Sequence, residues 1–558
     1  MKKRWTALIT AALLLFSSCA PAGQMRDPDQ STSSSTGDGS QAQTDQSEED
    51  HQKGGLPSEP APPSWEEGRT LNVALPDSYN GLELPIQGAT GFPTVELPLW
   101  AAVEDAQAAR EAVEAWEKAQ EEALLAQEQA AQETEAAGSQ SDPASDAAPA
   151  QETGGTGAES STPQEADPDQ PEGDGTQTDG TQSPETGPSE DAASMTDPGV
   201  TDPNVTGPGM SEPLPDQSGD PGTGDPVLPG GEEPVQEEPE VPTLNDGAIT
   251  LLPAGVPFTV LQEDGEWWYI AVEADYYQDE EQTVLLHGEL NGWVEHRYCM
   301  VNLPDVIPSI LYDATNSYSS RFVTCGRSIP EITGEAFYPD RTYNPRLNRS
   351  EFMMPVLYSM AKKLGQAQRA ALSEGNTLIL YEGFRPLSLQ LKVYNAMSAL
   401  VKNDPEVKAA VADPPWQITW FIAGGVANHQ QGYAVDVGLA KVTSAVEKYT
   451  NGYRHVRIIT FEQYKMPTPI HELSQAAATF TAPVAIFSST AWQKAELSAS
   501  MAASEPARGL QRYCTGAGLT PLASEWWHFN DLEAYFQVQD NLGRGDFTIS
   551  YIRSVAPG

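Results

Sequence analysis

The sequence predicts an α+β fold for the C-terminal part of this 558-residue chain, residues 306–558, behind a small all-β barrel and long disordered acidic linkers. Two segments have the apolar spacing of amphipathic helices, and three have the short alternating or apolar runs of strands. The helices are expected at 351–372 and 386–402, and the strands at 376–384, 432–440 and 524–530. They mix without a regular strand–helix–strand repeat, which favours α+β over a parallel α/β sheet.

The N-terminus has the layout of a secretory signal. Residues 1–19 contain a basic start, an apolar run of about ten residues and small residues before Cys19. Because Ser17, Ser18 and Cys19 resemble a bacterial lipobox, we expect Cys19 to carry a lipid anchor at the outer face of the cytoplasmic membrane. Residues 20–65 form a polar linker whose flexible reach is on the order of 35 to 40 Å.

The negative charge of the chain lies mainly in its linkers. The net charge is −49, and residues 1–245 hold 8 basic and 47 acidic residues. Residues 119–244 contain no Lys, Arg or aromatic residue, so they cannot bury enough apolar area to offset ordering entropy, and we expect them to be disordered. The Ala- and Glu-rich segment before them is expected to form a marginal helix. This charge balance argues against nucleic-acid binding.

Short strands surround this insert. Residues 245–305 contain alternating runs broken by Gly and Asp turns, which predict a small barrel. The runs GEWWYIAV and GWVEHRY resemble strands of a bacterial SH3-type domain, and residues 66–118 are expected to supply its first strand. Such a domain either binds the cell wall or caps the next domain, and the sequence favours neither role. Trp267, Trp268 and Trp293 are expected in its core.

Two motifs in the C-terminal region contain the residue types of an open zinc site. HQQGYAVD holds His429 and Asp436, and EWWH holds Glu525 and His528. A catalytic Zn²⁺ keeps three protein ligands and one water, whose pKa it lowers toward about 7. We therefore predict His429, Asp436 and His528 as zinc ligands, and Glu525 as the carboxylate that handles the proton. Taken singly, the same residues are also typical of a loop His and of an Asp that accepts a backbone hydrogen bond.

The spacing of these residues predicts local breaks in the strands. An offset of seven would put His429 and Asp436 on opposite faces of one straight strand, so we expect His429 in the loop before it, with Gly432 in the turn. Glu525 and His528 are three residues apart, so their segment needs a bend or bulge for both to point inward.

The motifs resemble those of a known enzyme family. HQQGYAVD is similar to the first-ligand motif of the LAS group of zinc peptidases, S-x-H-x-x-G-x-A-x-D, and EWWHF to their E-x-W-H motif. YEGFRP, residues 381–386, resembles the arginine segment of the vancomycin-resistance-type D-alanyl-D-alanine dipeptidases. The resemblance covers residues 306–558. It implies the same ligands, Glu525 as general base and Arg385 as the group that stabilises the tetrahedral oxyanion. A fixed guanidinium suits that role, although an Arg before Pro386 also fits a surface helix start.

Two positions depart from the family pattern. Ala427 stands where the family commonly has Ser, and His471 stands where the dipeptidases have an Asp. In the family these positions hold the free ammonium group of a dipeptide. Glu472 is the obvious substitute for the missing acid, so these three residues are the expected substrate contacts.

The resulting expectation is an extracytoplasmic zinc peptidase that hydrolyses D-alanyl-D-alanine bonds of peptidoglycan stem peptides or precursors, as a carboxypeptidase or a dipeptidase. One alternative is a non-catalytic wall-binding lipoprotein with a degenerate peptidase fold. Another is an L,D-peptidase or amidase on the same scaffold. Cys299, Cys325 and Cys514 allow at most one intramolecular disulfide.

Overall fold

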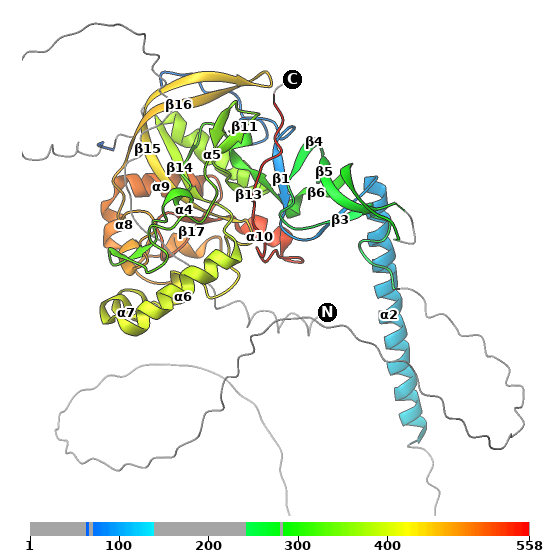
Figure 1. The fold of residues 1–558 in the computed structure, drawn as a ribbon. Coiled ribbons are helices and arrows are strands. Elements are labelled where there is room, and N and C mark those ends of the chain that lie inside the picture. Colours follow the sequence, from blue (N-terminus) through cyan, green and yellow to red (C-terminus); the bar gives the residue numbers. More distant parts are fainter. Residues whose placement is uncertain (1–62, 66–67, 69–70, 139–240, 279–282, 557–558) are drawn as a thin grey trace, which may run out of the picture. The chain divides into compact units, whose positions relative to one another are not determined.

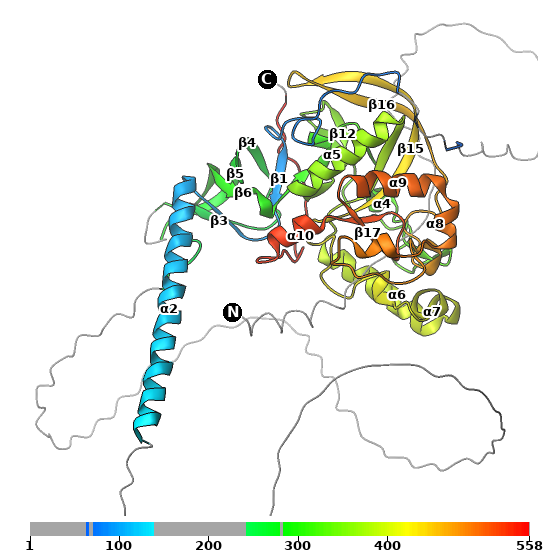
Figure 2. The same cartoon turned by 180° about the vertical axis from the view of Figure 1, so that it is seen from behind.

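The computed structural model describes residues 63–556 except 66–67, 69–70, 139–240 and 279–282 (Figures 1 and 2). The described residues up to Leu124 and from residue 241 onward belong to one compact unit, and the described residues from Leu125 to Gly138 belong to a second. The expected signal segment, Cys19, almost all of the 20–65 linker and most of the 119–244 insert lie outside the described residues. Within the described part, no helix is both long and apolar enough to cross a membrane.

An open antiparallel sheet of six strands brings together chain from both sides of the insert. Its order is β13-β7-β1-β4-β5-β6. The strands are β1 (Thr90–Pro93), β4 (Phe258–Asp264), β5 (Trp267–Tyr277), β6 (Leu285–Glu295), β7 (Cys299–Asn302) and β13 (Pro355–Leu357). Strand β1 pairs with both β4 and β7. Gly91 allows this close approach, because a Cβ there would meet the Phe258 ring at 2.2 Å.

The expected closed barrel is not formed by the described residues. Strand β13 comes from residues expected to begin a helix, and it pairs with the free side of β7. Because β13 occupies that side of β7, the edge strand β6 cannot pair with β7 to close the sheet into a barrel. Trp268 is fully buried, Trp267 is buried in a small cluster, and Trp293 packs against that cluster.

The helix α2 (Val103–Gly138) extends about twenty residues into the segment expected to be disordered from residue 119. The sequence VEDAQAAREAVEAWEKAQEEALLAQEQAAQETEAAG explains this extension, because it is rich in Ala, Glu and Gln and contains neither Gly nor Pro before its last residue. Helix propensity thus outweighs the lack of a strong apolar stripe.

The second large sheet holds the predicted site residues. Its order is β17-β18-β15-β14-β8, with β16 also paired to β15, and only the β14–β8 pair is parallel. The strands are β8 (Leu311–Tyr312), β14 (Asn376–Glu382), β15 (Ala434–Thr450), β16 (Tyr453–Gln463), β17 (Thr520–Pro521) and β18 (His528–Asn530).

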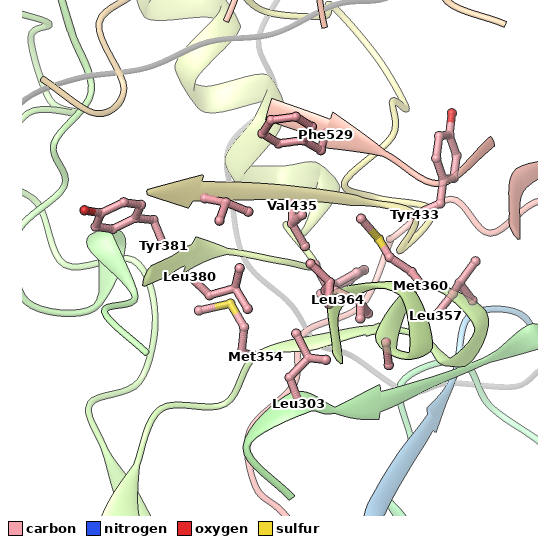
Figure 3. Close-up of a cluster of buried hydrophobic side chains, with 14 of the residues drawn as sticks. Leu303, Met354, Leu357, Met360, Leu364, Leu380, Tyr381, Tyr433, Val435 and Phe529 are labelled. Atoms are coloured by element: carbon pink, nitrogen blue, oxygen red, sulfur yellow. The ribbon is translucent and has the colours of Figure 1, made fainter. Parts of the chain in front are cut away.

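Helices α5 (Tyr358–Ser373) and α9 (Glu505–Gly516) pack on this sheet. Figure 3 shows Leu380 of β14, Val435 of β15 and Phe529 of β18 on neighbouring strands, near Met360 and Leu364 of α5. All of these side chains are fully buried.

One hydrophobic core continues from this sheet into the six-stranded sheet. The expected segments 245–305 and 306–558 therefore share a core. The helices and sheets around this core confirm a mixed α and β architecture with several sheets.

The remaining elements are β2 (Leu97–Leu99), β3 (Thr250–Leu252), η1 (His296–Tyr298), α3 (Leu303–Val306), α4 (Thr315–Tyr318), β9 (Val323–Thr324), β10 (Arg327–Ser328), β11 (Thr342–Asn344), β12 (Arg349–Glu351), α6 (Leu387–Asn403), α7 (Pro405–Ala412), η2 (Ile418–Trp420), η3 (Gln475–Ala477), η4 (Ala491–Lys494), α8 (Ala499–Ala503) and α10 (Leu532–Val538). Cys299, Cys325 and Cys514 are all free thiols, so none of the disulfides that the sequence allowed is formed.

A half-buried carboxyl group, that of Glu83, connects the segment before the insert to the C-terminal region. Both the backbone N–H and the hydroxyl group of Ser309 donate to it. Burial raises the pKa of Glu83 to about 7, against the opposing effect of these donors. A raised carboxyl pKa stabilises the fold at low pH, and this stabilisation is lost as the pH rises from about 4.5 to about 7.

We therefore expect Glu83→Gln to flatten the pH dependence of stability. Between pH 5 and pH 8 the wild type should lose about 1 to 3 kcal/mol more of its unfolding free energy than the variant, after allowing for partial exposure. Urea unfolding of both proteins at the two pH values measures the difference. Equal losses in the two proteins would contradict the prediction.

Candidate metal centre

A row of three polar side chains crosses the second sheet. Asp436 on β15 is the register partner of Glu382 on β14 and of His528 on β18. Each of the three is at most 2% exposed. Cross-strand partners on one face lie about 5 Å apart, so the sheet itself brings these groups together. A register shift between Leu380 and Glu382 lies at this end of β14.

His429 reaches the row from the turn before β15. Gly432 in that turn has a φ of 77°, a left-handed conformation that glycine adopts readily and that suits the expected turn at this position. His429 Nδ1 lies 2.8 Å from the carbonyl oxygen of Gly383, and the backbone N–H of Arg385 donates to the carbonyl oxygen of His429 at 3.4 Å. A Cβ at residue 383 would meet the carbonyl oxygen of Pro355 at 2.6 Å, so only glycine fits this close packing.

Glu525 enters the site from a turn immediately before β18. The backbone N–H of His528 donates to the carbonyl oxygen of Glu525 at 3.3 Å, which closes the turn. The bend expected in this segment therefore exists, and it brings a Glu525 carboxylate oxygen to 3.7 Å from His528 Nδ1.

Three ligand atoms converge at the centre of the row. His528 Nδ1 lies 3.2 Å from His429 Nε2 and 3.1 Å from Asp436 Oδ1, and His429 Nε2 lies 3.4 Å from the same oxygen. The outer ring nitrogens face acceptors, because His429 Nδ1 lies against Gly383 O and His528 Nε2 lies 3.0 Å from Asn530 Oδ1.

This arrangement fits a bound cation. With each imidazole donating its outer N–H to its acceptor, the two inner nitrogens and Asp436 Oδ1 would all be electron-pair donors that face one another. Such groups repel unless they share a positive charge. Two imidazoles and one carboxylate are a common ligand set for a divalent transition metal. The buried group of His429, Asp436 and His528 could therefore hold a metal ion.

The second oxygen of Asp436 has its own partners. His471 Nε2 lies 3.1 Å from Asp436 Oδ2, and Arg385 Nη2 lies 3.5 Å from it. Burial alone would raise the pKa of Asp436. His429 and the hydrogen bonds from the surrounding imidazoles instead hold that pKa well below its usual value. Asp436 is thus an anion that can accept a metal without first losing a proton.

The Glu525 carboxylate is buried and neither of its oxygens has a hydrogen-bond partner. Burial, with the negative charge of Asp436, raises the pKa of Glu525 well above its usual value, and Arg385 acts in the opposite direction. The indole N–H of Trp527 also favours the charged form, although it does not reach hydrogen-bond geometry. A buried carboxyl group without partners beside a candidate metal position is suited to exchange protons.

Arg385 is fully buried and held by two side chains. Its Nη2 pairs with Glu382, its Nη1 donates to Gln390 Oε1 at 2.8 Å, and its Nε has no partner. Although burial disfavours its charge, the pairing with Glu382 raises the pKa of Arg385 further above its usual value. Its guanidinium group is therefore a fixed cation with one donor still free.

Glu382 and Asn530 also contact the site, and neither was predicted from the sequence. Glu382 lies in the YEGFRP motif and also accepts hydrogen bonds from Asn316 Nδ2, at 2.9 Å, and from the Tyr338 hydroxyl group. The sequence signal that could have identified Glu382 is its position three residues before Arg385 in that motif. Asn530 lies two residues after His528, on the same side of β18, and an alternation pattern would have found it.

The three expected substrate contacts are all engaged within the protein. Ala427 donates its backbone N–H to Gln430 Oε1 at 2.8 Å. His471 bonds Asp436, as described above. The Glu472 carboxylate accepts the backbone N–H groups of Cys325 and Gly326 at 2.6 and 2.9 Å, and the Ser474 hydroxyl group at 2.7 Å.

The chain has no match among protein-family models or among curated proteins.

Proposed function

We propose that this chain is a zinc-dependent hydrolase of D-alanyl-D-alanine bonds in peptidoglycan stem peptides or precursors. The observation that carries the proposal is the convergence of His429, His528 and Asp436 on one point, with the unpartnered carboxylate of Glu525 beside it. A zinc ion bound there would supply a Lewis acid and an activated water. The proposal includes secretion and anchoring through Cys19 at the outer face of the cytoplasmic membrane.

The residues of the chain have distinct roles in this proposal. Glu525 accepts the proton of the attacking water and passes it to the leaving amine, which its burial and lack of partners support. Arg385 donates its free Nε–H to the carbonyl oxygen as that oxygen becomes anionic. Since both groups are buried, substrate entry requires a local opening, and closure afterwards strengthens both interactions by excluding water.

The engagement of Glu472 supports a substrate without a free ammonium group near the scissile bond. To reach such an ammonium, Glu472 would give up three hydrogen bonds that hold the loop at Cys325 and Gly326. An ammonium group buried without a carboxylate is costly. The site therefore suits a longer stem peptide, whose amine is already acylated, and the activity of a D,D-carboxypeptidase.

Two substrates test this choice. We expect kcat/KM for an N-acylated peptide ending in D-Ala-D-Ala to exceed that for free D-Ala-D-Ala. A preference of more than about tenfold, roughly 1.4 kcal/mol, for the free dipeptide would overturn the carboxypeptidase assignment.

Digestion of defined muropeptides, with the products identified by mass spectrometry, tests the reaction itself. Release of D-Ala supports the proposal. Cleavage at another bond would indicate the L,D-peptidase or amidase alternative. Zinc-loaded protein that cleaves nothing would indicate a wall-binding role.

A further inference from the structure

His471 is a fully buried imidazole with both ring nitrogens engaged. Its Nδ1 lies 3.1 Å from the hydroxyl oxygen of Thr315, and its Nε2 lies 3.1 Å from Asp436 Oδ2. The ring stacks on Phe322 with a centroid distance of 4.9 Å and an interplanar angle of 12°. The backbone of His471 has a φ of 63°, a conformation that non-glycine residues adopt only where their surroundings hold them.

The direction of the bond to Asp436 follows from chemistry. An ionised carboxylate can only accept, so His471 Nε2 must carry the hydrogen and donate it. The Thr315 hydroxyl group can then donate to Nδ1, which fixes this tautomer in the neutral ring. Thr315 and Phe322 together fix the position of the ring, so the N–H points at one oxygen of Asp436.

We propose that His471 is a positioning residue for the metal ligand Asp436. His471 and Arg385 both contact Oδ2, which leaves Oδ1 facing His429 and His528. The carboxylate is thereby held as a ligand through one oxygen and prevented from rotating. This inference rests on the metal centre of the proposed function, and it replaces the substrate contact expected of His471.

The same geometry argues against a second metal at His471. Glu382, Asp436 and His471 also lie close enough to hold a cation. Arg385 Nη2 already supplies positive charge between Glu382 and Asp436, and His471 Nε2 is occupied by its bond to Asp436. A binding stoichiometry of about one metal per chain is therefore expected, and about two would overturn the positioning role.

His471→Phe tests the proposal with little change in shape. Phenylalanine can keep the stacking on Phe322 but removes the donor to Asp436. We expect zinc affinity, measured by competition with a chromophoric chelator, to fall about 10- to 100-fold. His471→Gln retains an N–H donor and should recover most of the loss. The visible absorption of the Co²⁺-substituted protein should change in the Phe variant, because the ligand field depends on how Asp436 is held.

His455 provides a matched control. It is also a buried imidazole bonded to a threonine hydroxyl group, with Nε2 3.0 Å from Thr450 Oγ1, and it does not contact the metal ligands. His455→Phe should leave both the zinc affinity and the Co²⁺ spectrum unchanged. If His471→Phe does not fold, Thr315→Val provides a second test, because it removes only the hydroxyl group that fixes the ring, and it should weaken zinc binding several-fold.

The outcomes separate this inference from the proposed function. If the wild-type protein binds no zinc, the proposed function fails. If the wild type binds zinc and the His471→Phe variant binds it equally tightly, only the positioning role is wrong. The same conclusion follows from Thr315→Val where that variant replaces His471→Phe. If His455→Phe lost as much zinc affinity as His471→Phe, the loss would reflect general destabilisation of the fold, and the positioning role would be overturned.

Discussion

Glu525→Gln should leave the metal bound and lower kcat by at least about a hundredfold. The glutamine side chain fills nearly the same volume but cannot accept the proton of the attacking water, and general-base catalysis is typically worth 10²- to 10⁴-fold. The ligand atoms of His429, His528 and Asp436 do not include Glu525, so zinc affinity should change little. Single-turnover hydrolysis and zinc titration of the same preparation measure the two effects.

Glu351 supplies the control for this substitution. It is a buried carboxylate paired with Arg349 at 3.1 Å, and it is not among the residues of the metal centre. Glu351→Gln should keep full activity per folded molecule. If Glu525→Gln lost zinc while an Asp436 variant retained it, the roles assigned to the two carboxylates would be reversed.

The sequence predicted the parts of the site that depend on local geometry. The offset of seven between His429 and Asp436 required a loop and a turn at Gly432, and the structure has both. The three-residue spacing of Glu525 and His528 required a bend, which is also present. Such breaks are predictable because strand periodicity fixes which residues share a face.

The contacts between distant segments were not predictable in the same way. His471 meets Asp436 across 35 residues of sequence, and Thr315 meets His471 across 156. No periodicity in a single chain encodes such pairs, so the role expected of His471 came only from the resemblance to the dipeptidases.

The open sheet was missed for a related reason. The strand β13 has only three residues, and they run directly into the helix α5, so their apolar pattern could not be distinguished from the first turn of that helix.

Asp436→Ala should have the largest effect on the metal centre. It removes one of the three proposed ligand side chains. It also removes the acceptor for His471 Nε2; among the described residues, the other carboxylate near this nitrogen is Glu382, whose oxygen lies 3.7 Å away. Zinc affinity should therefore fall by more than the 10- to 100-fold expected for a residue that only orients a ligand. Breaking a buried charged pair also costs roughly 3 to 5 kcal/mol, so the metal-free variant should be less stable than the metal-free wild type.

Urea unfolding in the presence of a chelator measures this second loss separately from zinc binding. His528→Ala provides the comparison, because it removes a ligand without removing the buried anion, and its unfolding free energy should fall less. Since the pKa of Asp436 in the metal-free protein is well below its usual value, the advantage of the wild type over Asp436→Ala should shrink as the pH falls below about 4. An advantage that grew as the solution was acidified would mean that Asp436 is protonated in the folded protein, and it could not then serve as the anionic ligand.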